Sequence, residues 1–185
     1  MGDIVFGTDG WRGGIAEDYT FANVRRCSQG FADYMKETYA DELERGVVIG
    51  GDKRFLSEQF AAAAAEVLAA NGIPVHFCGG GVPTPVLSFG VTDAHALGAI
   101  NITASHNPPG DNGFKVRDPN GGAIDPDGLL AIEAHIPGSI AGVKRMRFDE
   151  AEQAGLIRRY DPVPAYDARI RSLVDVERIR DAGFT

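Results

Sequence analysis

The sequence has little cysteine and no long apolar run. Its 185 residues include two cysteines, Cys27 and Cys78, without the C-x-x-C spacing of redox or zinc motifs. We therefore expect both thiols to be reduced and buried in a cytoplasmic protein. No apolar segment approaches the ~20 residues that cross a bilayer, and the first residues do not have the pattern of a signal peptide. A membrane protein or a disulfide-stabilised secreted domain is not expected.

Positive charge is also scarce. The 18 Lys and Arg residues against 26 Asp and Glu leave a net charge of −8, which argues against general nucleic-acid binding. Nine basic residues precede Gly138, and five of these lie beside loops with distinctive motifs: Arg12, Lys53, Arg54, Lys115 and Arg117. This grouping indicates a small anion, such as a phosphate, as partner. The alternative is that charges collect in loops without binding anything.

The apolar patterns predict strands and helices in alternation. Short β-branched or apolar runs predict strands at residues 47–49, 73–77, 97–103 and 114–117. Capping residues followed by apolar stripes predict helices that begin near Thr20, Ser57, Thr84 and Asp125. Connections long enough for crossovers imply a layered α/β/α sheet.

The pattern changes after Pro137. Residues 138–154 have little periodicity and mixed charge, which is typical of a linker or a solvated extension. A helical stripe returns with Val163, Tyr166 and Ile170, and a further turn is predicted near Val176.

The most specific stretch is Thr103-Ala104-Ser105-His106-Asn107-Pro108, which follows the predicted strand 97–103. Parallel α/β sheets place their chemistry at the carboxyl ends of strands. Asn107-Pro108 prevents a helix from continuing, and residues 111–113 (Asp-Asn-Gly) predict a turn. The sequence therefore predicts a serine hydroxyl held at the edge of the sheet.

Two further motifs precede this stretch. Residues 6–13 read F-G-T-D-G-W-R-G, which matches neither the G-x-G-x-x-G dinucleotide fingerprint nor a P-loop. The glycines allow a tight backbone path, and the planar guanidinium of Arg12 suits phosphate oxygens. Residues 50–54 read G-G-D-K-R, directly after the first predicted strand.

These three motifs, in this order, resemble those of the α-D-phosphohexomutases, the family of phosphoglucomutases and phosphomannomutases. The resemblance covers Ile4 to Pro137 closely and residues 160–185 loosely. It implies an α/β/α first domain at residues 1–137, with a small mixed sheet of four strands of which the last is antiparallel. Residues 138–159 would be a linker, and residues 160–185 the beginning of a truncated second domain.

The family uses four domains, and the D-x-D-x-D metal loop of the second does not occur in this sequence. The resemblance therefore implies that the missing C-terminal domains complete the site and that the fragment alone is inactive. It implies roles for individual residues as well. Ser105 would carry the phosphoryl group and, through it, bind Mg²⁺ as one ligand. His106 and Lys115 would be catalytic, the turn at 111–113 directing Lys115 toward Ser105. The expected substrate-binding residues are Thr8, Arg12, Arg54 and Asn107.

The implied reaction interconverts hexose 1-phosphate and hexose 6-phosphate through a hexose 1,6-bisphosphate. A phosphoglucosamine mutase of the same family is an alternative, although such members more often have Ile where Trp11 stands. A non-catalytic, phosphorylatable binding domain is a second alternative for the chain as given. A serine hydrolase is disfavoured, because Ser105 lacks the G-x-S-x-G context.

Overall fold

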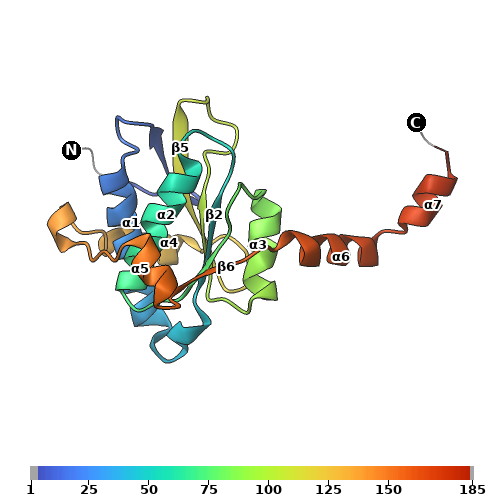
Figure 1. Cartoon of the computed structure of the whole chain (residues 1–185). Coiled ribbons are helices and arrows are strands. Elements are labelled where there is room, and N and C mark those ends of the chain that lie inside the picture. The colour runs from blue at the N-terminus through green and yellow to red at the C-terminus, as the bar shows by residue number, and fades with distance from the viewer. Residues whose placement is uncertain (1–3, 184–185) are drawn as a thin grey trace.

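A six-stranded mixed sheet forms the centre of the computed structural model, which describes residues 4–183 (Figure 1). The spatial order is β1-β5-β4-β2-β3-β6. The strands β2, β3, β4 and β6 pair in parallel, whereas β5 is antiparallel to β4 and β1 is antiparallel to β5. Their bounds are Gly10–Gly14 (β1), Val47–Gly51 (β2), Val75–Phe77 (β3), Ala99–Ile102 (β4), Asp111–Arg117 (β5) and Ile157–Arg159 (β6). The outermost residues of the expected domains, 1–3 and 184–185, lie outside this description.

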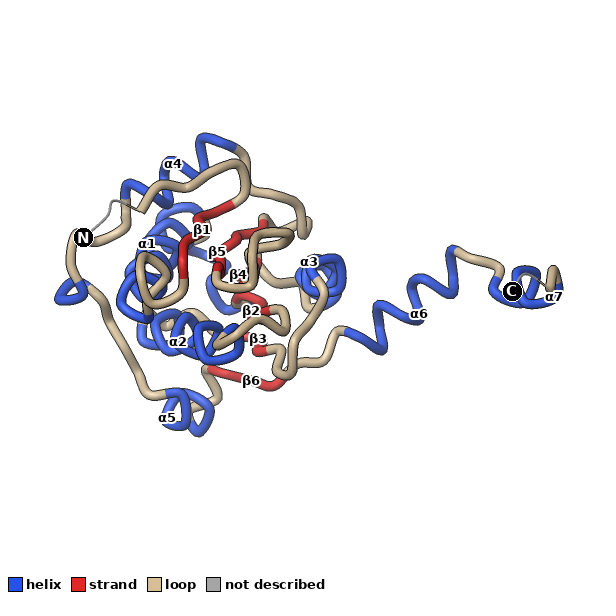
Figure 2. Tube along the Cα trace, turned by 90° about the horizontal axis from the view of Figure 1, so that it is seen from above, coloured by secondary structure: helices blue, strands red, loops and turns tan. Residues whose placement is uncertain are grey.

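Helices cover both faces of the sheet, which confirms the predicted α/β/α layers. Figure 2 shows α1 and α2 on one face and α3 on the other, with α4 and α5 flanking the α1–α2 side. The α-helices are Phe21–Thr38 (α1), Ser57–Ala70 (α2), Thr84–Asp93 (α3), Pro126–Ala134 (α4), Phe148–Gln153 (α5), Val163–Leu173 (α6) and Val176–Asp181 (α7). Two 3₁₀ helices, η1 (Ala40–Arg45) and η2 (Ile140–Gly142), lie in the connections.

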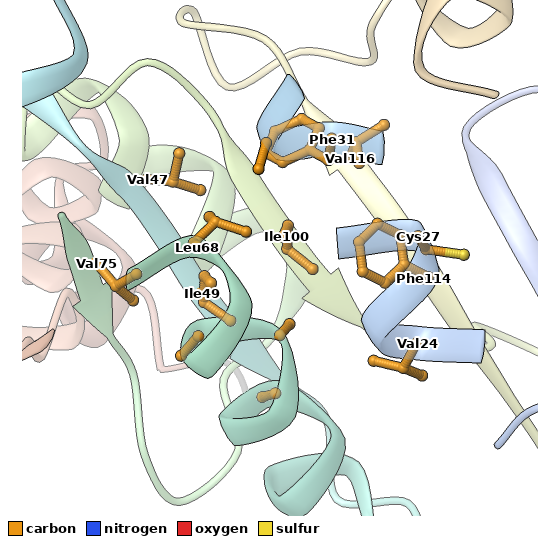
Figure 3. Close-up of a cluster of buried hydrophobic side chains, with 14 of the residues drawn as sticks. Val24, Cys27, Phe31, Val47, Ile49, Leu68, Val75, Ile100, Phe114 and Val116 are labelled. Atoms are coloured by element: carbon orange, nitrogen blue, oxygen red, sulfur yellow. The ribbon is translucent and has the colours of Figure 1, made fainter. Parts of the chain in front are cut away.

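The main core lies between the sheet and the α1–α2 layer (Figure 3). Strand side chains alternate between faces, so Ile49, Ile100 and Phe114 pack toward α1 and α2, where they are fully buried. The opposite face carries a smaller cluster under α3, which includes Val48 and Ala99. Both faces are buried, which explains why the central strands read as continuous apolar runs.

The expected number of four strands was wrong, because the sheet also contains β1 and β6. Strand β1 consists of the glycine-rich opening motif, for which the sequence predicted only a tight backbone path. A Cβ on Gly10 would lie 2.1 Å from the carbonyl oxygen of Phe114 on the neighbouring strand. Gly10 also has a φ of +142°. Glycine is therefore what allows this backbone to approach β5 closely enough to pair.

Residues 138–159 are not the solvated linker that the sequence predicted. They contain α5 and β6, and β6 extends the sheet by pairing with β3. Ala151 and Ile157 are buried in the main core. Glu66 on α2 accepts hydrogen bonds from Arg145 Nε (2.7 Å) and from the backbone N–H of Phe148 (3.3 Å). This segment is part of the first packed unit.

Helices α6 and α7 extend away from the sheet (Figures 1 and 2). The ring of Tyr166 on α6 lies edge-on to Phe89 on α3 at 5.6 Å, but neither α6 nor α7 has a buried residue within the part of the chain that the structure describes. Among residues 4–183, no helix is long and apolar enough to cross a membrane.

Candidate functional site

The loop that follows β4 places Ser105 at the carboxyl end of this strand. Thr103 and Ala104 are buried, whereas Ser105 and His106 are exposed. Ser105 has a φ of +57°, a left-handed backbone conformation that is unusual for a residue with a side chain. A cavity of about 520 Å³ opens beside it, lined by Asp52, Lys53, Arg54, Phe55, Ser105, Asn107 and Pro109. The loop thus presents its serine at a polar hollow.

The turn in this loop lies earlier than the sequence predicted. Asp111, Asn112 and Gly113 begin β5, where Gly113 pairs with Arg12 of β1. The chain reverses just before them, and the N–H of Asp111 donates to the carbonyl of Pro108 at 3.0 Å. The prediction of a turn at residues 111–113 was therefore wrong, since the turn lies at residues 108–111.

Arg54, from the loop after β2, binds the backbone of the serine loop. Its Nη2 donates to the carbonyls of Ser105 (2.9 Å) and Asn107 (2.8 Å), and its Nη1 donates to those of Pro108 (2.7 Å) and Asp111 (3.1 Å). The four contacts bridge the two sides of the turn. Arg54 thus lies at the Ser105 loop, and its terminal nitrogens face protein carbonyls.

Asp52 connects the same β2 loop to the end of β4. Its Oδ2 accepts a hydrogen bond from Thr103 Oγ1 at 2.6 Å, and Oγ1 in turn accepts from the backbone N–H of Ser105 at 3.0 Å. Its Oδ1 accepts from Ser57 Oγ (2.8 Å) and from the N–H of Arg54 (2.9 Å). The Ser57 side chain therefore supports Asp52, while Leu56 stands at the N-cap of α2 in place of the predicted Ser57.

Arg12 reaches the serine loop from the other side. Its Nη1 donates to Asn107 Oδ1 at 2.8 Å, and Asn107 Nδ2 donates to Asp111 Oδ2 at 2.9 Å. Thr8 is exposed and lines, with Asp9 and Arg12, a second hollow of about 290 Å³. The structure thus brings Arg12, Arg54 and Asn107 to the Ser105 loop, and Thr8 lies next to Arg12.

Lys115 lies on β5 and contacts Asp9. Its Nζ is 2.8 Å from Asp9 Oδ2, and Nη2 of Arg117 is 3.7 Å from the same oxygen. Burial by itself raises the pKa of Asp9, but the hydrogen bond from Lys115 and the nearby positive charges outweigh it, so that the pKa lies below its ordinary value. The Lys115 side chain is only 9% exposed. Its ammonium group is directed to Asp9, and residues 111–113, which were expected to turn it toward Ser105, are part of β5.

The acidic side chains near Ser105 are already engaged as hydrogen-bond acceptors. Asp52 accepts from Thr103, Ser57 and Arg54, and Asp111 accepts from Asn107. Within residues 4–183, no three His, Cys, Asp or Glu side chains are grouped so that they could hold a metal ion. Ser105, which is exposed beside the cavity, has a hydroxyl oxygen that it can offer to a divalent cation.

The sequence reasoning did not single out Asp9, Asp52 or Thr103. Each stands inside one of the three motifs, near a cation or the serine. A signal was present for Asp52, since an acidic residue two positions before Arg54 at a strand end can orient it. No local signal connects Asp9 with Lys115, because the two are 106 positions apart.

Residues 3–140 match the family model for "Phosphoglucomutase/phosphomannomutase, alpha/beta/alpha domain I". A phosphoglucomutase from Komagataeibacter xylinus is 32% identical over 98% of this chain and 35% of its own length. A phosphoglucosamine mutase from Synechococcus elongatus is 38% identical over 72% of this chain and 28% of its own length.

Among solved structures, a protein from Thermus thermophilus described as a phosphomannomutase is similar with a TM-score of 0.82 and 35% identity. The match covers 95% of this chain and 37% of that one. The chain thus spans about a third of the length of these similar proteins.

Proposed function

Because the chain belongs to the phosphoglucomutase/phosphomannomutase family, we propose that it is the phosphoserine-carrying part of a phosphosugar mutase, with Ser105 as the residue that is phosphorylated. The observation that supports this most directly is the exposed Ser105 beside a polar cavity of about 520 Å³, on a loop bound by Arg54.

In the proposed reaction, a sugar-phosphate hydroxyl attacks the phosphorus carried by Ser105. The bond from phosphorus to Ser105 Oγ breaks, a bond to the sugar oxygen forms, and the product is a sugar bisphosphate. The attacking hydroxyl loses its proton, and Ser105 Oγ gains one as its bond to phosphorus breaks. The reverse transfer, from the other phosphate of the bisphosphate, restores the phosphoserine and releases the isomer. The hexose 1- and 6-phosphates are the substrates that we propose.

Phosphoryl transfer requires positioning and electrostatic stabilisation from the protein more than covalent chemistry. Arg12 can offer a guanidinium to phosphate oxygens at the second hollow, where Thr8 adds a hydroxyl. His106 is exposed beside Ser105 and can move a proton there. Lys115 would stabilise charge or transfer a proton, on condition that it leaves Asp9.

Mg²⁺ fits this scheme as a partner of the phosphoserine, which would supply one oxygen ligand. When bound, the ion would neutralise phosphate charge that otherwise repels an incoming sugar phosphate. Its remaining ligands would come from outside residues 4–183, where no group of three candidate ligands occurs.

The similar proteins are about threefold longer, and their names include glucose, mannose and glucosamine enzymes. We therefore propose that further domains complete the mutase and select the sugar, and that residues 1–185 alone are inactive. A glucosamine substrate remains an alternative. So does a binding domain in which phosphorylated Ser105 is recognised without turnover.

The test is phosphoryl labelling of the complete protein that contains this chain. Incubation with hexose 1,6-bisphosphate labelled in its phosphates should label one serine, and Ser105→Ala should abolish the label. Ser139→Ala, at an exposed serine outside the loop, should leave it unchanged. Label that persists in Ser105→Ala contradicts the proposal. Label without sugar-phosphate isomerisation favours the binding-domain alternative.

A further inference from the structure

Ser105 is held in a conformation that it would not adopt by preference. Its φ of +57° places it in the left-handed region, where a Cβ crowds the backbone. Such residues persist where the surrounding structure determines them, and they concentrate at functional sites. The contacts of this loop should therefore include groups that enforce the conformation.

Arg54 has the geometry for this task. A guanidinium carries five N–H donors, four of them on the two terminal nitrogens. Those two nitrogens make four hydrogen bonds of 2.7–3.1 Å to the carbonyls of the loop, and Nε lies 3.2 Å from Asp52 Oδ2. Every donor is thus directed at the protein, and the side chain is only 15% exposed. To bind a phosphate, Arg54 would have to abandon carbonyls of the serine loop.

Asp52 holds both ends of the arrangement. Its carboxylate accepts hydrogen bonds from the backbone N–H of Arg54 and from the hydroxyl of Thr103. It also forms an ion pair with Nε of Arg54. The same hydroxyl accepts the N–H of Ser105. The amide on one side of Ser105 is therefore fixed through Thr103 and Asp52, and the carbonyl on the other side is fixed by Arg54.

We propose that Arg54 and Asp52 are positioning residues that hold Ser105 in its left-handed conformation, with the side chain at the cavity. Arg54 acts on the loop and makes no direct contact with substrate, which replaces the role that the sequence predicted for it. The use of the held serine in phosphoryl transfer rests on the proposed function. The positioning of Ser105 by Arg54 and Asp52 is independent of the proposed function.

Lys53 offers a matched comparison. It is a cation next in sequence and lines the same cavity, but among the described residues it makes no hydrogen bond to the serine loop. Lysine at position 54 would keep the charge and lose the planar fork, since one ammonium cannot reach four carbonyls on both sides of a turn. Arg54→Lys therefore tests the planar guanidinium with the charge kept, and Lys53→Met tests the loss of a neighbouring positive charge.

The first measurement is amide hydrogen exchange in the 185-residue chain, which requires no activity. In Arg54→Lys and Arg54→Met, the amides of Ser105, Asn107 and Asp111 should exchange about tenfold faster or more, with β2 and β4 still protected. Lys53→Met should leave these rates unchanged. Unchanged loop exchange in both Arg54 variants would overturn the proposal.

If the Arg54 variants unfold, Thr103→Val decides the question, because it keeps the side-chain shape and removes the hydroxyl between Asp52 and Ser105. Faster exchange at the Ser105 amide supports the proposal, and an unchanged rate overturns it.

The second measurement is kinetic, in the complete mutase. Arg54→Lys should lower kcat on the order of 10²-fold with KM nearly constant, as expected when a reacting group is misplaced. If KM rises in Arg54→Met and returns to the wild-type value in Arg54→Lys, Arg54 binds phosphate through its charge, and the proposal is overturned. If the loop loosens as expected but wild-type Ser105 takes up no label, the proposed function fails and the positioning role stands.

Discussion

Three of the cations near Ser105 are paired within the protein. Arg54 is bound to loop carbonyls, Arg12 to Asn107, and Lys115 to Asp9. Pairing keeps a long side chain in one rotamer, which reduces the entropy that binding a substrate phosphate would otherwise cost. It also means that a cation must exchange partners before it can act on a substrate.

Lys115→Met should lower kcat and kcat/KM together in the complete enzyme. The ammonium is nearly buried and held by Asp9, so we expect its proton or charge to be used in the transition state. Loss of acid–base assistance typically costs ~10²–10⁴-fold in rate. Steady-state kinetics measures the effect, with Lys36→Met on α1 as a control that should retain activity. An unchanged kcat removes Lys115 from the catalytic residues, and a raised KM alone makes it a substrate anchor.

Asp9→Asn should change how stability depends on pH. The pKa of Asp9 lies below its ordinary value of 3.8, although burial opposes this, because Lys115 and its basic neighbours favour the carboxylate. A depressed pKa contributes stability that is complete above the ordinary value and is lost as the pH falls through the folded-state pKa. Wild type should therefore be more stable than Asp9→Asn at neutral pH, and the difference should shrink below about pH 3.8.

Urea unfolding at several pH values measures this difference. Asp41→Asn, at an exposed position in η1, is the control and should change stability by no more than about 0.5 kcal/mol. A wild-type advantage that stays constant as the pH falls well below the ordinary pKa would show that Asp9 contributes by packing and not by charge.

At the scale of elements, the two edge strands of the sheet, β1 and β6, are the strands that the sequence did not predict. Strand β6 is only three residues long and contains two arginines, yet it covers the open edge of β3. Arg159 also stacks over the rings of Phe77 and Phe148 at 5.3 and 5.0 Å. The sheet edge is therefore closed by a short strand whose side chains are anchored from α5.

A chain that ends at Pro137 should consequently be less stable than the full 185 residues. It would lose Ile157 and Ala151 from the core and would leave β3 as an exposed edge. Burial of a side chain such as Ile contributes about 1.5–3 kcal/mol, so we expect a loss of at least about 2 kcal/mol. The free energy of unfolding in urea measures this loss.

A chain that ends at Val174 is the control, because it removes α7 and the few residues on either side of it, and no residue of α7 is buried. Its stability should match that of the full chain within about 0.5 kcal/mol. Equal stability of the Pro137 variant would mean that α5 and β6 dock without contributing and that the predicted linker is a linker in energetic terms.

At the scale of the whole molecule, the chain is one layered unit with two helices that extend from it. The serine loop, the Arg54 loop and the opening strand meet at one edge of the unit, joined by hydrogen bonds across 51–95 positions of sequence. We propose phosphate binding at this edge, and within residues 4–183 no three His, Cys, Asp or Glu side chains are grouped so that they could hold a metal ion.

Titration of the 185-residue chain with Mg²⁺ should accordingly give weak, non-saturating heats. Magnesium requires near-octahedral oxygen coordination, and unphosphorylated Ser105 supplies one oxygen. Isothermal titration calorimetry measures the heats, and Ser105→Ala should give the same result. Tight stoichiometric binding would reveal a metal site that the described residues do not suggest.

The sequence by itself determined the features that depend on neighbours in the chain. Apolar runs and caps predicted β2, β4 and the helices α1–α4, and the T-A-S-H-N-P motif placed Ser105 at a strand end. These features follow from local conformational preference and from periodic burial, which are written along the chain.

Only the tertiary structure decided which distant segments meet. Gly10–Gly14 has poor strand propensity and forms β1 because β5 lies beside it. Lys115 forms an ion pair with Asp9, and Arg54 donates hydrogen bonds to the carbonyls of the serine loop. A backbone carbonyl carries no residue identity, so no sequence pattern indicates that an arginine will bind one. The sequence determined which groups are present at the site, and the packing of the sheet decided which of them are already in use.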